Sequence, residues 1–144
     1  MNIHDYKFEH PHCELASLFP RVGGEILIPF QNTVRLPLFG RHWRLEAHEL
    51  HHVVGQTSRG RTNDERNVLH LNHYVHSWLT DNTCAGRILC CRALKDMGRL
   101  DWAFLSGLDR KNWPGIFDTD PYIEACKRYP WVEECRTELI RKAA

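Results

Sequence analysis

The apolar and polar positions divide the chain into a β-rich first half and a helical second half. Residues 25–30 are rich in β-favouring side chains, and residues 33–38 alternate apolar and polar in the manner of a strand. Residues 31–32 between them suit a turn, so we expect a β-hairpin near the N-terminus. Before it, residues 13–18 favour a short helix that ends ahead of a proline.

The middle of the chain predicts two strands, a polar loop and a helix. Residues 43–54 favour a strand, and residues 55–66 are polar, contain glycine and lack apolar periodicity, which predicts a loop. Residues 68–71 form a short apolar run that is typical of a buried strand. Asn72 is of a residue type that caps helix N-termini, and it precedes a helix predicted over residues 73–79.

The last third of the chain is predicted to be helical. Residues 85–97 carry apolar side chains at helical spacing. Residues 101–108, 122–128 and 132–141 are further helical segments, and Pro130 separates the last two. The expected fold class is therefore α+β, with an N-terminal β-hairpin, a strand–loop–strand–helix centre and a helical C-terminal half.

The composition is that of an ordinary globular domain. Hydrophobic residues make up 42% and charged residues 26%, which excludes a disordered chain. No apolar run approaches the roughly 20 residues of a membrane-spanning helix, so we expect no membrane partner. The N-terminus lacks the basic-then-apolar pattern of a secretory signal, and we expect a cytoplasmic protein. We expect a single domain over 1–144, with a β-rich segment (1–42), a central motif (43–80) and a helical region (81–144).

Positive charge is concentrated in the centre of the chain. The net charge is only +1, but residues 35–99 contain ten Lys/Arg against six Asp/Glu. This local excess is compatible with contacts to phosphates, although a mixed solvated surface gives the same count.

The six cysteines do not predict a disulfide framework. None of them forms a Cys-x-x-Cys pair, and no export signal is visible. We therefore expect buried or free thiols.

Histidine is the unusual residue in this sequence, with seven of the ten between residues 42 and 76. The string Glu49-Leu50-His51-His52-Val53 is followed by Asn67, 15 positions after His52, and then by His76, nine positions after Asn67. Neutral imidazoles are good ligands for a divalent metal, and an imidazole that titrates near neutrality can take a proton from water. Adjacent strand residues face opposite sides, so one histidine can face a metal while its neighbour faces the attacking water.

This pattern resembles the HNH, or ββα-metal, nuclease motif, and its spacing is similar to that of the colicin DNase domains. The resemblance covers residues 45–80 of the 144. It implies a ββα-metal core in which His51 and His76 bind one divalent metal ion and His52 is the general base. It also implies that Asn67 orients the base or completes the metal coordination.

Two further residues join this constellation. Glu49 lies on the same side of its strand as His51, so we expect it to fix the orientation of that ring. His73 lies one helical turn before His76 and shares its face, which makes it a candidate further ligand. Asn67 and water are the alternatives for that coordination position.

The sequence departs from the family pattern in two places. Thr80 stands where some members carry a further metal-binding histidine, four positions after the helix histidine. Asn72 and Val75 stand where other members carry the second Cys-x-x-Cys pair of a structural zinc site. That structural zinc is therefore not expected.

The function expected from the resemblance is metal-dependent hydrolysis of DNA phosphodiester bonds, leaving a 5′-phosphate and a 3′-hydroxyl, in a phage or mobile-element setting. Mg²⁺ is the expected ion, with Zn²⁺, Mn²⁺ or Ni²⁺ as alternatives. The loop arginines Arg59, Arg61 and Arg66 are candidate phosphate contacts, because guanidinium matches phosphate bidentately, with a solvated loop as the alternative. DNA is the expected partner, and a double-strand break would need a homodimer or two separate events.

Two other functions stay open at this point. The first is a DNA-binding module that kept the HNH fold without catalysis. The second is a zinc metalloprotease, because His48-Glu49-x-x-His52 also satisfies the His-Glu-x-x-His signature. That signature works only on a helix, and the flanking residues 53–55 favour its interruption.

Overall fold

The computed structural model describes residues 1–55, 61–109 and 112–143, and its fold is α+β as expected. One antiparallel sheet has the order β1-β2-β3, made of Arg21–Val22, Glu25–Ile28 and Val34–Pro37. A separate antiparallel pair consists of Glu49–His52 (β4) and Val68–Leu71 (β5). The helices are α1 (Ile3–Glu9), α2 (His73–Asp81), α3 (Thr83–Asp96), α4 (Trp102–Asp109), α5 (Asp120–Arg128) and α6 (Pro130–Ala143), with short 3-10 helices η1 (Ala16–Leu18) and η2 (Gly115–Asp118). Within these ranges no helix has the length and apolarity needed to span a bilayer.

The predicted N-terminal hairpin is confirmed. β2 and β3 pair antiparallel, with Ile26 opposite Leu36 and Ile28 opposite Val34. Ile26 and Ile28 are fully buried, because alternate residues of β2 face the core. The two-residue strand β1 is too short to show an alternation of its own, and it is found only in the structure.

The centre of the chain forms two antiparallel strands followed directly by a helix. Glu49 at the start of β4 lies opposite Leu71 at the end of β5. All four residues of β5 are buried, so this strand runs through the interior. Asn72 then caps α2 as predicted, since its side chain accepts a hydrogen bond from the backbone N–H of Tyr74. Helix α2 therefore returns against β4.

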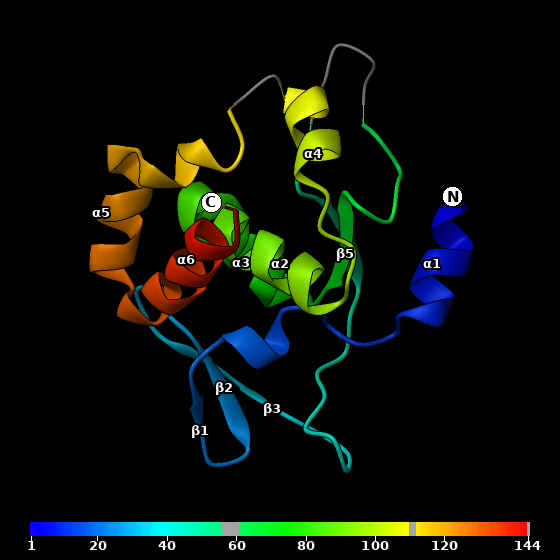
Figure 1. Ribbon diagram of the computed structural model, residues 1–144. Helices are drawn as coiled ribbons and strands as arrows, with labels where there is room; N and C mark the ends of the chain where they lie inside the picture. Colours follow the sequence, from blue (N-terminus) through cyan, green and yellow to red (C-terminus); the bar gives the residue numbers. More distant parts are fainter. Residues whose placement is uncertain (56–60, 110–111, 144) are drawn as a thin grey trace.

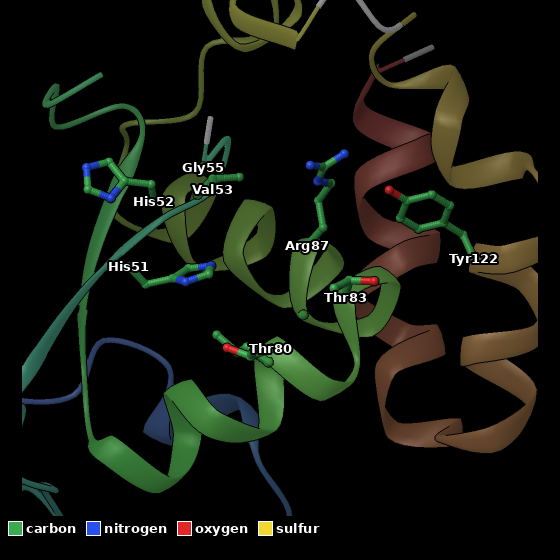
Figure 2. A pocket seen from close by; sticks show the side chains of 10 residues that line it. His51, His52, Val53, Gly55, Thr80, Thr83, Arg87 and Tyr122 are labelled. Carbon is green, nitrogen blue, oxygen red and sulfur yellow. The ribbon is translucent and has the colours of Figure 1, made fainter. Parts of the chain in front are cut away.

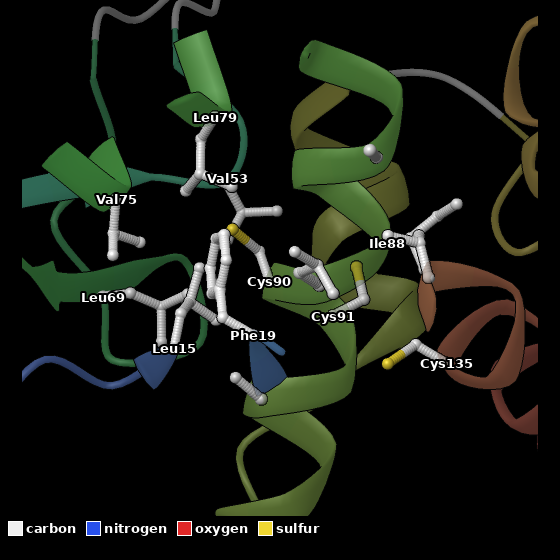
Figure 3. Packing of buried hydrophobic residues seen from close by; sticks show 14 of the residues in the cluster. Leu15, Phe19, Val53, Leu69, Val75, Leu79, Ile88, Cys90, Cys91 and Cys135 are labelled. Atoms are coloured by element: carbon white, nitrogen blue, oxygen red, sulfur yellow. The ribbon is translucent and has the colours of Figure 1, made fainter. Parts of the chain in front are cut away.

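The hydrophobic core lies around α3, which packs against α2, α5 and α6 (Figures 1 and 3). Buried side chains reach it from all parts of the chain, including Leu15, Phe19, Leu69, Val75, Ile88 and Cys135. Gly86 allows α3 to begin close to α2, since a Cβ at this position would lie 2.9 Å from Cδ2 of Leu79. All six cysteines are free thiols, and all except Cys84 are buried.

Helix α1 lies beside β5 and is held there by polar contacts (Figure 1). The hydroxyl of Tyr6 donates to the buried carboxylate of Glu14. Arg99 donates from Nη1 to the Tyr6 hydroxyl at 2.6 Å and from Nη2 to Glu14 at 2.8 Å. This helix was not expected from the sequence, although Asn2 gives a local signal for it, since the Asn2 side chain caps the helix by accepting from the N–H of Asp5.

Two expected segments are shorter in the structure than in the sequence analysis. The helix expected over residues 13–18 is reduced to η1, and the strand expected over residues 43–54 is reduced to β4. Trp43 has a φ of +52°, which a strand does not allow. The N–H of Cys13 donates to the carbonyl of Leu45, so the segment before β4 is held by the N-terminal part of the chain and does not continue the strand.

Candidate active site

His51 and His76 come together where β4 meets α2. Their ring centres lie 5.0 Å apart with an angle of 69° between the ring planes. Two imidazoles bound to one ion at about a right angle also place their ring centres about 5 Å apart, given metal–nitrogen bonds of about 2.1 Å. An edge-to-face contact between two rings has a similar separation, so the orientation of each ring decides what the pair can do.

Glu49 sets the orientation of His76. Its Oε1 lies 2.9 Å from Nδ1 of His76, and its Oε2 lies 3.1 Å from Nδ1 of His73. The hydrogen bonds from His73 and then from His76 lower the pKa of the Glu49 carboxyl, and an ionised carboxylate can only accept. Both rings therefore present Nδ1–H to Glu49, which leaves the Nε2 lone pair of His76 free for a ligand role.

The expectation that Glu49 fixes the ring of His51 is therefore wrong. Strand alternation does place Glu49 and His51 on one side of β4, but the carboxylate reaches across to α2 instead. His73 shares the helix face with His76 as expected, because both rings meet the same carboxylate. The side chain of His73 is 61% exposed, whereas that of His76 is 28% exposed.

His51 is kept neutral by its surroundings. Desolvation, aided by the neighbouring His76, His52 and Arg87, lowers the pKa of His51 to about 4. Within the described ranges its ring nitrogens make no hydrogen bond. A neutral imidazole with an unpaired nitrogen is the form that binds a metal.

His52 has a partner that the motif does not include. Its Nε2 lies 2.7 Å from Oδ1 of Asn63, in the loop that follows β4. An amide oxygen only accepts, so Nε2 carries the proton and Nδ1 is left as an acceptor. Figure 2 shows the ring of His51 pointing toward helices α2 and α3 and the ring of His52 pointing away from them, as the alternation of a strand predicts.

Asn67 holds the ends of this loop and makes no hydrogen bond to His52. The residue is fully buried, and its Oδ1 accepts from the N–H of Val54 at 2.8 Å. Its Nδ2 donates to the carbonyls of Val54 at 3.1 Å and Thr62 at 3.0 Å. With both ends of the amide engaged by the backbone, this geometry supports a positioning role for Asn67 and not metal coordination.

Replacing Asn67 with alanine is expected to destabilise the protein by about 2–4 kcal/mol, because backbone groups of Val54 and Thr62 lose their partners in a buried place. Urea unfolding followed by circular dichroism measures this. Asn63→Ala is the matched control on the same loop, and it should change stability by less than about 1 kcal/mol. Equal stabilities of the two variants would contradict the role given to Asn67.

The three loop arginines differ in what they contact. Arg59 lies outside the described residues. Arg66 donates to Asp64 and to Asp101 at 3.0 Å each, so its guanidinium is already used to hold the loop against the start of α4. Arg61 lines the same cavity as the three central histidines and makes no ion pair with another described residue. Of the two described loop arginines, Arg61 is therefore the one that is not already paired with carboxylates.

The histidines line two adjoining cavities. One has a volume of about 330 Å³ and is lined by Leu50, His51, His52, Gly55, Arg61, His76 and Thr80. The other, of about 360 Å³, shares His51, His52, Gly55 and Thr80 and continues toward α3 and α5 (Figure 2). A ligand bound at the histidines can therefore extend into either cavity.

The donor set fits an ion that keeps free coordination positions. In the part of the chain that the structure describes, no group of three or more His, Cys, Asp or Glu side chains is placed to hold one ion. A closed zinc site with four protein ligands therefore does not fit. The imidazoles of His51 and His76 fit a divalent cation that takes its other ligands from water and substrate oxygens.

The metalloprotease alternative lacks its helix. Residues Glu49–His52 form strand β4, so His48 and His52 do not share a helical face. His48 is also engaged elsewhere, since its Nδ1 accepts from the backbone N–H of His73. The arrangement that the His-Glu-x-x-His signature needs is therefore absent from this segment.

No family model, curated protein or solved structure matches this chain.

Proposed function

We propose that this protein is a metal-dependent endonuclease of the HNH type that hydrolyses DNA phosphodiester bonds, with β4, β5 and α2 as its ββα-metal core. The observation that carries the proposal is that three neighbouring imidazoles differ in their hydrogen-bond partners. His76 is held by Glu49, His52 is held by Asn63, and the half-buried ring of His51 makes no hydrogen bond to another described residue. The hydrogen-bond partner of a ring decides which of its nitrogens is free to bind a metal or a proton. Histidines that only fill space would not need a different partner for each ring.

Each residue of the site has one role in this reaction. His51 and His76 would hold the divalent cation through neutral ring nitrogens. When bound, the cation would polarise the scissile phosphate and neutralise charge on the leaving 3′-oxygen. His52 accepts, at Nδ1, the proton of the water that attacks phosphorus while the bond to the 3′-oxygen breaks. Asn63 keeps the proton of His52 on Nε2, and Asn67 holds the loop in place. The leaving 3′-oxygen takes a proton from solvent water, so the products are a 5′-phosphate and a 3′-hydroxyl.

Replacing Glu49 with glutamine is expected to weaken Mn²⁺ binding by about 10–100-fold. The amide has one accepting oxygen for two Nδ1–H groups, and its NH₂ group would face the other one. Isothermal titration calorimetry with Mn²⁺ measures the effect. Glu46→Gln is the control, because Glu46 is exposed and its ion pair is with His48 at 3.5 Å. An unchanged affinity in Glu49→Gln would remove Glu49 from the site.

A plasmid-nicking assay tests the proposed function. We expect the wild-type protein to convert supercoiled plasmid into nicked circles with Mg²⁺, Mn²⁺ or Ni²⁺, and EDTA to stop the reaction. DNA binding without cleavage under all three ions would instead support a non-catalytic DNA-binding module. Casein digestion blocked by a zinc chelator would support the protease.

A further inference from the structure

The larger cavity extends beyond the histidines to a second wall of polar groups. It runs from His51 and Thr80 to Thr83 and Arg87 of α3 and to Tyr122 of α5 (Figure 2). We call Thr83, Arg87 and Tyr122 the α3–α5 wall. None of the three takes part in the proposed cleavage step.

Arg87 is held in position and is only partly neutralised. Its Nη1 donates to Asp109 at 3.2 Å, and its guanidinium lies 5.3 Å from the ring centre of Trp113. The side chain is 25% exposed, and these two contacts restrict where its guanidinium can lie. A guanidinium has five N–H donors, of which one is bonded to Asp109 and another to the hydroxyl of Tyr122. The others can serve a ligand.

The lining of this cavity favours an anion. Among the described residues that line it there is no carboxylate, whereas Arg87 supplies a positive charge. Thr83 and Tyr122 add hydroxyl groups, and burial raises the pKa of the Tyr122 hydroxyl, which therefore keeps its proton and can donate. A guanidinium beside neutral hydroxyls matches the oxygens of a phosphate.

The α3–α5 wall lies apart from the groups that would act on the scissile phosphate. His76 and Arg61 line the smaller cavity, whereas Arg87 and Tyr122 line the larger one. His51 and His52 line both, and so lie between the two. A phosphate at the α3–α5 wall is therefore a neighbour of the one that is cleaved.

We propose that the α3–α5 wall binds a second phosphate of the DNA strand, next to the scissile one. The inference rests on the proposed function and adds a substrate requirement to it. The protein would favour a chain with consecutive phosphates over an isolated phosphodiester. Arg87 would set affinity and register without taking part in bond cleavage.

Three full-length variants separate this role from a structural one. Arg87→Gln removes the cation. Asp109→Asn breaks the same ion pair but keeps the cation. Arg92→Gln removes another arginine of α3, which is 27% exposed, is paired with Asp96 at 3.0 Å and is not among the residues that line this cavity.

Binding is measured in EDTA with a DNA duplex of about 20 base pairs at several salt concentrations. We expect Arg87→Gln to bind about tenfold more weakly at about 0.1 M salt, with a slope of log affinity against log salt that is shallower by about 0.9. Asp109→Asn and Arg92→Gln should bind within about twofold of wild type. Metal-dependent hydrolysis of bis(p-nitrophenyl) phosphate, which has no neighbouring phosphate, should fall by much less in Arg87→Gln than its DNA affinity does.

Wild-type affinity and salt slope in Arg87→Gln would overturn the inference and leave the nuclease proposal standing. An equal loss in Arg87→Gln and Asp109→Asn would also overturn it, because the ion pair would then be structural. A loss of activity on the small diester as large as the loss of DNA affinity in Arg87→Gln would place Arg87 at the scissile phosphate and so contradict the second site. A wild-type protein that neither binds nor nicks DNA would overturn both proposals.

If Arg87→Gln does not fold, the DNA affinity and salt slope are measured with Arg87→Lys instead. It keeps the charge but loses the planar fork of the guanidinium. We expect it to retain the wild-type salt slope and to lose part of the affinity. A shallower salt slope in this charge-conserving variant would contradict the inference.

Discussion

Replacing His52 with alanine is expected to lower the kcat for plasmid nicking by about 10²–10⁴-fold, with little change in KM. His52 is the imidazole whose Nε2 is held by Asn63 and whose Nδ1 is left to accept a proton. The other two rings are poor substitutes. Burial lowers the pKa of His51 to about 4, which makes it a weak base. His76 uses Nδ1 in the hydrogen bond to Glu49, and the proposal assigns its Nε2 to the metal ion.

Two measurements separate this chemical effect from a loss of structure. The Mn²⁺ affinity and the urea unfolding curve of His52→Ala should match those of wild type. His52 is not a proposed metal ligand, and its half-buried ring has Asn63, a loop residue, as its hydrogen-bond partner. Asn63→Ala should show a smaller loss of kcat, about tenfold, since the ring remains but its tautomer is no longer fixed. Equal nicking by wild type and His52→Ala would remove His52 from the mechanism.

Replacing His51 or His76 with alanine is expected to weaken Mn²⁺ binding by about 100-fold or more. Removing a group that only orients a metal ligand typically costs about 10–100-fold in affinity, so removing the ligand itself should reach at least the upper end of that range. The two rings supply the neutral nitrogens that the proposal assigns to the ion. Calorimetric titration of Mn²⁺ into each purified variant measures the change.

His73→Ala is the matched control for these two variants. His73 lies on the same helix as His76 and meets the same carboxylate of Glu49, but its side chain is 61% exposed. We expect its replacement to change Mn²⁺ affinity by less than about fivefold. A loss as large as that of His76→Ala would make His73 a ligand. If His51→Ala and His76→Ala both bind Mn²⁺ with wild-type affinity, the ion does not bind at these two histidines.

The sequence was sufficient to predict which segments surround the site. The buried apolar run over Val68–Leu71 and the cap at Asn72 are local signals, and both were confirmed. Together they return α2 against β4, which is why the spacing from Asn67 to His76 brings His76 to His51. Strand alternation likewise predicted that His51 and His52 face different ways.

The sequence could not predict the partners that orient the rings. Alternation placed Glu49 beside His51, but a glutamate side chain is long enough to reach across to α2, and the two Nδ1–H groups there determine where it lies. Asn63 is one of several polar residues in a loop without periodicity, so no pattern distinguished it. Arg87 belongs to an amphipathic helix, and the sequence alone predicts that an arginine there faces solvent. Only the fold shows that Arg87 lines a cavity.

Anomalous diffraction from crystals soaked in Mn²⁺ tests most directly whether this site binds an ion. We expect a single peak bonded to Nε2 of His76 and to a ring nitrogen of His51, with Nδ1 of His52 facing the space beside it. A peak bonded to neither histidine, or no peak at this site in crystals of the wild-type protein, would contradict the proposed metal site.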